Sequence, residues 1–181
     1  MSTQAVAPDL RYPVGPFKPE ATPLLDSQRA TMIQDIADLP SKLRAAVAGL
    51  NDEQLDVPYR DGGWTPRQIV HHLADSHSHS YLRTRFALTE NNPTIVPYPE
   101  AVWAELTDAK HAAVELSLRM LEGIHGRWTM LLKSLKPEDW KRTLFHPERG
   151  QLDLNTILAL YSWHSKHHVA HITELRKRKG W

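Results

Sequence analysis

The sequence predicts an all-α fold, namely a four-helix bundle that follows an extended N-terminal arm. Three observations support this prediction: apolar residues recur at helical spacing over long stretches, capping and turn residues separate those stretches, and alternating strand patterns are absent. Four amphipathic helices of roughly 25 to 30 residues bury their apolar faces against one another in a bundle. Because 181 residues suit a single core, we expect one domain over residues 21–181, preceded by an arm of residues 1–20.

The arm is predicted to be extended because proline, which lacks a backbone N–H, interrupts helices. Its prolines are Pro8, Pro13, Pro16 and Pro19. Such a segment is either disordered or lies against a partner subunit. The arm also lacks the apolar run of a signal peptide, so we expect a cytoplasmic protein.

The first predicted helix runs from Pro23 to Leu50, where apolar residues follow one helical stripe. Pro40 lies inside this stretch and removes one backbone donor, so we expect a kink or a break there. Asn51 then caps a short helical turn.

The remaining helices are delimited by caps and prolines. The second spans residues 65–90 and opens with an N-cap threonine followed by proline. The third is predicted over residues 99–137, and residues 141–152 are predicted to form a loop. An aspartate caps the last helix, which covers residues 153–179.

Composition narrows the classes of function. Lys and Arg total 22 against 21 Asp and Glu, so a net charge of +1 gives no bulk attraction for nucleic acid. No stretch reaches the roughly 18 apolar residues of a membrane span. The chain has no cysteine, so its 11 histidines, with Asp and Glu, are the candidate metal ligands. We therefore expect a small-molecule substrate, with no nucleic-acid partner and no membrane.

The last helix carries two histidine pairs at the i, i+4 spacing, His164 with His168 and His167 with His171. Helical geometry places His168 near the centre of the apolar stripe and His164 about 50° from it, whereas His167 points about 110° away. The pattern favours His164 and His168 as the inward pair. The alternative is a polar layer of hydrogen-bonded histidines within the core.

The second helix carries a further group of histidines. His77 lies in the middle of its apolar face, His72 lies on the flank, and His71 points away from both. His72 also belongs to a polar column with His79 and Arg83. Such a column is typical of a helix that lines a cleft, or of an ordinary solvated face.

Two histidines one turn apart and a third from a neighbouring helix offer a divalent metal three nitrogen ligands and leave one position open, as in catalytic sites. The pair on the last helix is not an HExxH motif, which excludes a protease of the zincin type. A di-iron site of the ferritin type needs two Glu-x-x-His motifs. We find one, at Glu122–His125.

Four stretches form a composite pattern: Arg11–Gly15, Tyr59–His77, His146–Glu148 and Trp163–Ile172. Together they resemble the DinB/YfiT-like superfamily of metal-dependent four-helix bundles, most closely its YfiT-type metal-dependent hydrolases. The resemblance covers nearly the whole chain. It implies that fold for the present chain.

In that superfamily the first metal ligand is the histidine eight residues after a tryptophan that precedes Ser or Thr. Here this is His72, after Trp64, and the other two ligands correspond to His164 and His168. The resemblance thus prefers His72 and leaves its neighbours His71 and His77 as the alternatives.

The resemblance has three further implications. Many relatives have glutamine where this chain has His171, which implies that His171 orients a ligand. One divalent ion per subunit is implied, with zinc as the first choice and nickel as the second, since imidazole suits both. A similar arm in the relatives implies a homodimer in which the arm lies across the partner.

The first functional hypothesis is a metal-dependent hydrolase, in which the three-histidine site activates water at its open position. Asp75 and Glu148 are the carboxylates expected to serve in proton transfer. The alternative is a thiol-dependent S-transferase of the bacillithiol or mycothiol type that acts on electrophilic small molecules, with Arg83 as a contact for the anionic thiol cofactor. A third hypothesis is a non-catalytic metal-binding bundle.

Overall fold

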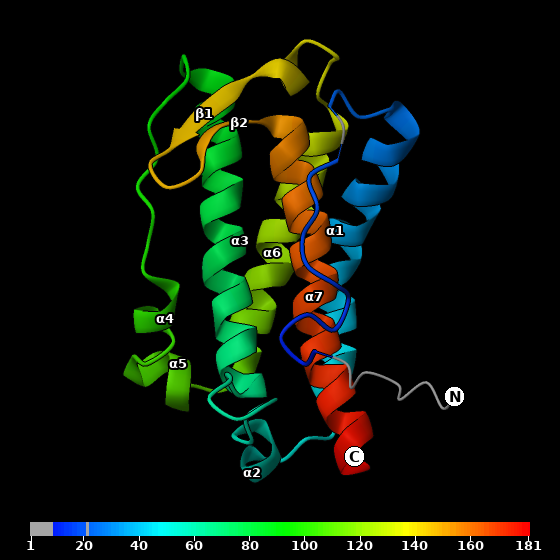
Figure 1. The fold of residues 1–181 in the computed structure, drawn as a ribbon, viewed down its shortest axis with the longest axis vertical. Helices are drawn as coiled ribbons and strands as arrows, with labels where there is room; N and C mark the ends of the chain where they lie inside the picture. The colour runs from blue at the N-terminus through cyan, green and yellow to red at the C-terminus, as the bar shows by residue number, and fades with distance from the viewer. Residues whose placement is uncertain (1–8, 21) are drawn as a thin grey trace, which may run out of the picture.

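The computed structural model describes residues 9–20 and 22–181. In these ranges the long helices are α1 (Asp26–Val47), α3 (Pro66–Thr89), α6 (Val114–Lys133) and α7 (Leu154–Lys179), and Figure 1 shows them side by side. The shorter elements are α2 (Asp52–Leu55), α4 (Glu100–Trp103), α5 (Thr107–His111), the 3-10 helix η1 (Asp139–Lys141), β1 (Thr143–His146) and β2 (Gly150–Asp153).

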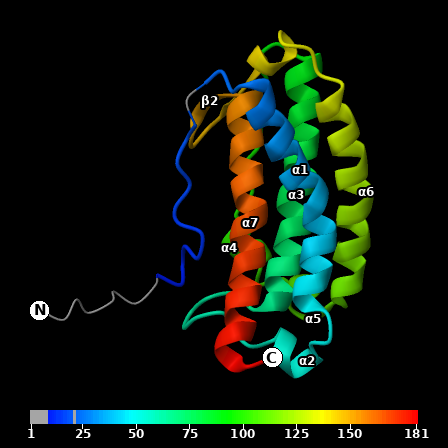
Figure 2. The ribbon, with the colours of Figure 1, turned by 90° about the vertical axis from the view of Figure 1, so that its right-hand side faces the viewer.

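The long helices form a bundle, as predicted. Helix α1 packs against α6 and α7, and α3 packs against the same two helices from the other side. Helices α1 and α7 run in one direction, while α3 and α6 run in the other (Figures 1 and 2). The segment between α3 and α6 therefore returns along the length of the bundle, carrying α4 and α5.

The bundle interior contains two apolar clusters with a layer of histidines between them. Along α3, Leu73 belongs to one cluster and Tyr81 to the other. Along α7, Ile172 and Tyr161 divide in the same way. Most of the α3 and α7 histidines lie between these positions in the sequence. A polar layer thus crosses the bundle at mid-length.

The predicted caps are confirmed. The hydroxyl of Thr65 accepts from the backbone N–H of Gln68 at 3.2 Å, and the carboxylate of Asp153 accepts from the N–H of Thr156 at 2.8 Å. Helix α7 ends at Gly180, whose φ of 73° is in the left-handed region that glycine adopts without strain.

A kink or a break was expected at Pro40. The break is wrong, because α1 continues through this residue to Val47. Proline leaves the carbonyl of Ile36 without its usual N–H donor. His125 of α6 replaces that donor, since its Nδ1–H donates to the Ile36 carbonyl at 2.6 Å. A side chain from the neighbouring helix therefore compensates for the proline.

The single helix predicted over residues 99–137 is also wrong, because the chain forms α4, α5 and α6 with breaks between them. Side chains of α3 bind the backbone at these breaks. Gln68 donates to the carbonyl of Ala104 at 2.8 Å, and Arg67 donates to the carbonyl of Ala112 at 3.1 Å. These tertiary hydrogen bonds favour broken segments over a continuous helix.

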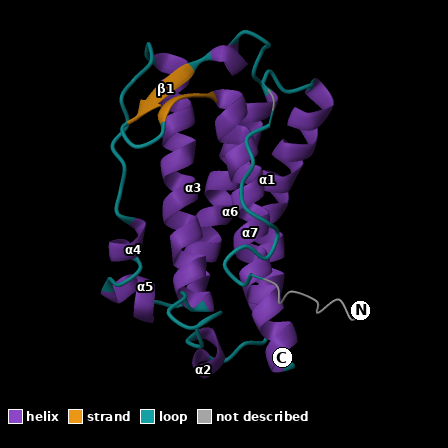
Figure 3. Ribbon diagram, viewed as in Figure 1, coloured by secondary structure: helices purple, strands orange, loops and turns teal. Residues whose placement is uncertain are grey.

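The loop predicted over residues 141–152 contains a short antiparallel hairpin, in which Thr143 pairs with Asp153 and His146 pairs with Gly150 (Figure 3). Its strands have four residues each, too few for an alternating pattern to be recognised. Ile95 donates to the carbonyl of Phe145 at 3.0 Å, which joins the hairpin to the segment after α3.

The described part of the arm, residues 9–20, lies along α7 of its own chain (Figure 2). The indole N–H of Trp163 donates to the carbonyl of Gly15 at 3.0 Å, and Nε2 of His171 donates to the carbonyl of Arg11 at 3.2 Å. Of the two expectations for the arm, contact with a partner subunit stays a prediction, as does the homodimer. Residues 1–8 lie outside the described residues.

Within the described ranges, no helix combines the length and the apolar character needed to cross a bilayer.

Candidate metal centre

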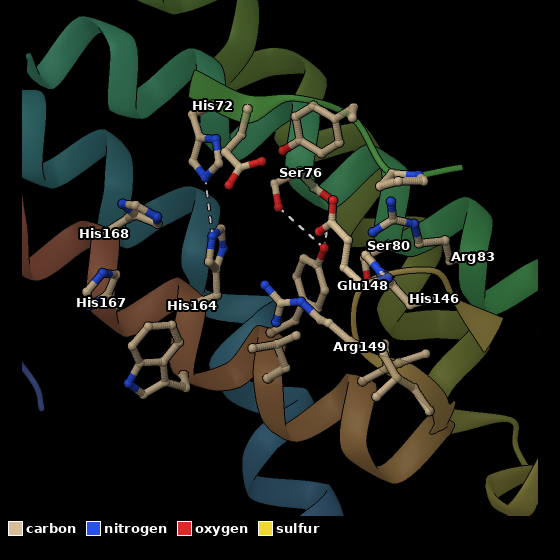
Figure 4. A pocket seen from close by; sticks show the side chains of 18 of the residues that line it. His72, Ser76, Ser80, Arg83, His146, Glu148, Arg149, His164, His167 and His168 are labelled. Atoms are coloured by element: carbon tan, nitrogen blue, oxygen red, sulfur yellow. Dashed lines mark hydrogen bonds between the residues drawn. The ribbon is translucent and has the colours of Figure 1, made fainter. Parts of the chain in front are cut away.

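The structure brings His72 of α3 together with His164 and His168 of α7 (Figure 4). One ring nitrogen of each residue lies within 4.8 Å of the others. The Nε2 atoms of His72 and His164 are 3.3 Å apart. His72 and His168 are buried, and His164 is partly buried. We call these three residues the three-histidine cluster.

The cluster fits a divalent metal ion in both geometry and charge. Two ligands at 2.0–2.1 Å from a tetrahedral ion are about 3.3 Å apart, which matches the separation of the two Nε2 atoms. Burial, and then the nearby His167, lower the pKa of His72 to about 3, while burial and neighbouring histidines lower the pKa values of His164 and His168. The three rings are therefore neutral at pH 7, the state in which imidazole binds metal.

The outward nitrogen of His168 is held by His171. The Arg11 carbonyl can only accept, so Nε2 of His171 carries a proton and its Nδ1 has a lone pair. That Nδ1 faces Nδ1 of His168 at 3.4 Å. His168 consequently donates from Nδ1, which leaves its Nε2 with a free lone pair for the cluster. This geometry supports the orienting role that the resemblance implies for His171.

His167, His168 and His171 form a second group with ligand nitrogens within 4.8 Å of one another. His168 belongs to both groups. One imidazole serves two ions only after losing its last N–H proton, yet the contact with His171 uses that proton. We therefore assign His168 to the three-histidine cluster.

The alternatives to His72 have other partners. His71 lies buried between α3 and the start of α6, where Nδ1 is 2.7 Å from the Ser117 hydroxyl and Nε2 is 3.2 Å from the Ala112 carbonyl. His77 is fully buried, and its Nε2 lies 3.1 Å from Nδ1 of His164. His77 thus contacts the side of His164 that faces away from His72.

A cavity of about 290 Å³ opens beside the cluster, close to the smaller volumes typical of ligand sites. Trp64 packs against His72 with ring centroids 4.6 Å apart. On the wall between the helices, the Tyr161 hydroxyl donates to the Ser76 carbonyl at 3.2 Å. The remaining lining comes from α3, α7 and the hairpin, and from the start of α4 and the segment before it.

Of the predicted polar residues, Glu148 and Arg83 line this cavity (Figure 4). Asp75 is not among the lining residues. Burial, followed by the charge of Asp108 of α5, raises the pKa of Asp75. The structure therefore brings Glu148, but not Asp75, to the space beside the cluster.

Sequence reasoning missed Arg149 and His167, which also line the cavity. Arg149 lies in the hairpin turn, and nothing in the sequence pattern showed that this turn lines the cavity beside the cluster. His167 was expected to point away from the core, yet it is buried because the arm covers that side of α7. Its ring stacks on Trp163 with centroids 4.3 Å apart and lies 6.1 Å from Tyr12 of the arm.

Comparison with known proteins decides the family of this chain. A family model of the DinB superfamily matches residues 36–172. The chain belongs to the DinB superfamily. The resemblance noted in the sequence is thereby confirmed.

Relatives within the DinB superfamily extend over nearly the whole chain. A protein of Bacillus cereus (strain 03BB102) named "Putative metal-dependent hydrolase" is 53% identical over 173 residues, which is 96% of this chain and 99% of that protein. A relative from Bacillus thuringiensis subsp. konkukian has the same identity and coverage and a similar name.

Among solved structures, YfiT from Bacillus subtilis superposes with a TM-score of 0.92 at 50% identity, covering 95% of this chain and 98% of that one. It is described as a probable metal-dependent hydrolase with an unusual four-helix bundle topology. The predicted fold class is confirmed by this match.

Proposed function

We propose that this protein is a metal-dependent hydrolase of small molecules, in which His72, His164 and His168 hold one divalent ion. The observation that carries the proposal is the cluster itself. Three neutral imidazoles converge beside a cavity, and the Nε2 atoms of His72 and His164 have the separation expected of two ligands on a tetrahedral ion. The names of the relatives support the same reaction class.

An ion bound there would supply a nucleophile at neutral pH, because it lowers the pKa of a coordinated water to about 7. His72, His164 and His168 would hold the ion and would leave one position open for water, as in catalytic sites with three protein ligands. Glu148 lines this cavity and accepts the proton that the reaction releases. Trp64, packed on His72, shields the ligands from bulk water.

The cavity also carries balanced fixed charges, with Arg83 and Arg149 opposed by Glu100 and Glu148. Burial, followed by the charges of the two arginines, lowers the pKa of the nearby His146. Arg83 donates to the carbonyl of Val96 at 3.2 Å, which holds its guanidinium at the cavity wall. We propose that Arg83 contacts a polar group of the substrate, or of a thiol cofactor if the protein transfers thiols.

The ligand set suits zinc and nickel alike, since both bind imidazole. We propose zinc as the resident ion. Metal analysis of protein purified without a nickel column tests this choice, and the finding of one nickel and no zinc per chain would contradict it.

The function is tested with a panel of small esters and amides, and in a separate assay with a thiol plus an electrophile. We expect turnover of esters or amides without thiol, its loss on chelation, and its return with zinc. Glu148→Gln should lower kcat by about 10²- to 10⁴-fold, as general-base removal does, while zinc content stays at the wild-type level.

Three results would contradict the proposal. Turnover that persists after confirmed metal removal would exclude metal-dependent hydrolysis. Turnover that appears only with thiol and electrophile would identify a thiol S-transferase. Metal binding without turnover in either assay would favour a non-catalytic bundle.

A further inference from the structure

His77 is the most deeply buried histidine of α3, and the proposed mechanism does not use it. None of its surface is exposed. Its Nε2 lies 3.1 Å from Nδ1 of His164, so the two rings share one hydrogen bond in the interior of the bundle. The direction of this hydrogen bond determines which nitrogen of His164 has a free lone pair.

The direction follows from the use of His164 as a ligand. Nε2 of His164 faces Nε2 of His72 at 3.3 Å, so this is the nitrogen that points to the cluster. A neutral imidazole with a lone pair on Nε2 carries its proton on Nδ1. Nδ1–H of His164 then donates, Nε2 of His77 accepts, and His77 keeps its own proton on Nδ1.

The surrounding aromatic rings hold His77 in place. It stacks on His125 with centroids 4.9 Å apart and an interplanar angle of 20°, and it meets Tyr161 edge-on at 5.0 Å. His125 is itself fixed by its hydrogen bond to the Ile36 carbonyl, which Pro40 leaves free. The packing of aromatic rings against His77 therefore holds the acceptor offered to His164.

We propose that His77 is a positioning residue: it accepts the Nδ1–H of His164, orients that ring and keeps its Nε2 available for the metal ion. The inference rests on the proposed metal site but not on the reaction catalysed there. Together with His171 on His168, it gives both ligands of α7 an imidazole as the outer hydrogen-bond partner. Partners of this kind set the tautomer and the orientation of metal-bound histidines.

The test compares zinc affinity, measured by competition with a chromophoric chelator, for three variants. His77→Phe keeps an aromatic ring but removes the acceptor, and we expect affinity to fall by about 10- to 100-fold. His77→Gln places an amide oxygen at nearly the same reach, and it should restore affinity to within about threefold of wild type.

His125→Phe is the matched control. It also replaces a histidine by phenylalanine, in the ring that stacks on His77, and it leaves the hydrogen bond between His77 and His164 unchanged. It should lower the melting temperature, since the Ile36 carbonyl loses its donor, yet leave zinc affinity within about twofold of wild type. An equal affinity loss in His125→Phe and His77→Phe would show that only packing matters, which would overturn the proposal.

Cobalt substitution distinguishes a positioning residue from a ligand. At saturation, His77→Phe should keep the wild-type positions of the visible cobalt bands, because the three ligands are unchanged. Shifted bands would show that His77 itself binds the ion, and unchanged zinc affinity in His77→Phe would show that its hydrogen bond does not position His164; either result overturns the inference.

If His77→Phe does not fold, long-range ¹H–¹⁵N spectra of the zinc-loaded wild type decide the matter. We expect protons on Nδ1 of both His164 and His77, and a proton on Nε2 of His77 would overturn the inference. A wild type that binds no divalent ion would instead refute the proposed function and this inference together.

Discussion

At the scale of single residues, two buried histidines each donate a hydrogen bond to a backbone carbonyl. Nε2 of His171 donates to the Arg11 carbonyl, and Nδ1 of His125 donates to the Ile36 carbonyl. A backbone carbonyl cannot donate, so each contact fixes the tautomer of its imidazole. Through its contact with Nδ1 of His168, His171 thus also sets the tautomer of His168.

His125 gives a prediction about pH. Burial lowers its pKa to about 4, with the Ile36 carbonyl opposing the shift, whereas an exposed histidine titrates near 6.5. Between these values the unfolded chain binds the proton more readily, so the free energy of unfolding falls as pH drops from 6.5 to 4. The expected loss from His125 is about 3 kcal/mol, taken as an order of magnitude.

Urea unfolding of the metal-free protein at several pH values measures this effect. His125→Phe should be less stable than wild type at pH 7 but should lose less stability between pH 6.5 and 4. An equal loss of unfolding free energy in both proteins over that range would contradict this prediction.

At the scale of elements, the sequence predicted what depends on local chemistry. The Thr65 and Asp153 caps and the inward pair on α7 follow from neighbours along the chain. The breaks at Ala104 and Ala112 do not, because they depend on side chains of α3 that lie more than thirty residues earlier in the sequence. The burial of His167 likewise required knowledge of where the arm lies.

The arm is expected to support the metal centre. Deleting residues 1–19 removes the Arg11 carbonyl that fixes the tautomer of His171, so zinc affinity should fall by about tenfold. His171→Ala in the full-length chain should give a similar loss. Combining the deletion with His171→Ala should lower zinc affinity little further, because both changes break the same series of hydrogen bonds that leads to His168. A truncated protein with full-length affinity would show that the arm does not act through His171.

At the scale of the whole molecule, the histidine layer crosses the bundle between two apolar clusters. Helices α3 and α7 each contribute to both clusters, so the histidines of the three-histidine cluster are carried on rigid elements. The hairpin and the segment before α4 close the cavity from the side. The apolar clusters thus flank the layer in which we propose that the metal ion is held.

The homodimer remains a prediction at this scale. Residues 9–20 lie on α7 of the same chain, which leaves a face of the arm free for a partner. We expect sedimentation at micromolar concentration to give twice the chain mass for the full-length protein. A monomer under these conditions would contradict the prediction, and a dimer that persists without residues 1–19 would show that the arm is not the contact.

The central claim is that His72, His164 and His168 together hold one divalent ion. Its most direct test is metal content per chain in wild type, in three single alanine variants of the cluster, and in His71→Ala, with folding checked by circular dichroism. We predict one ion per chain in wild type and in His71→Ala, whose side chain faces Ser117, and close to none in His72→Ala, His164→Ala and His168→Ala. Full occupancy in His72→Ala, or loss of the ion in a folded His71→Ala, would contradict the account.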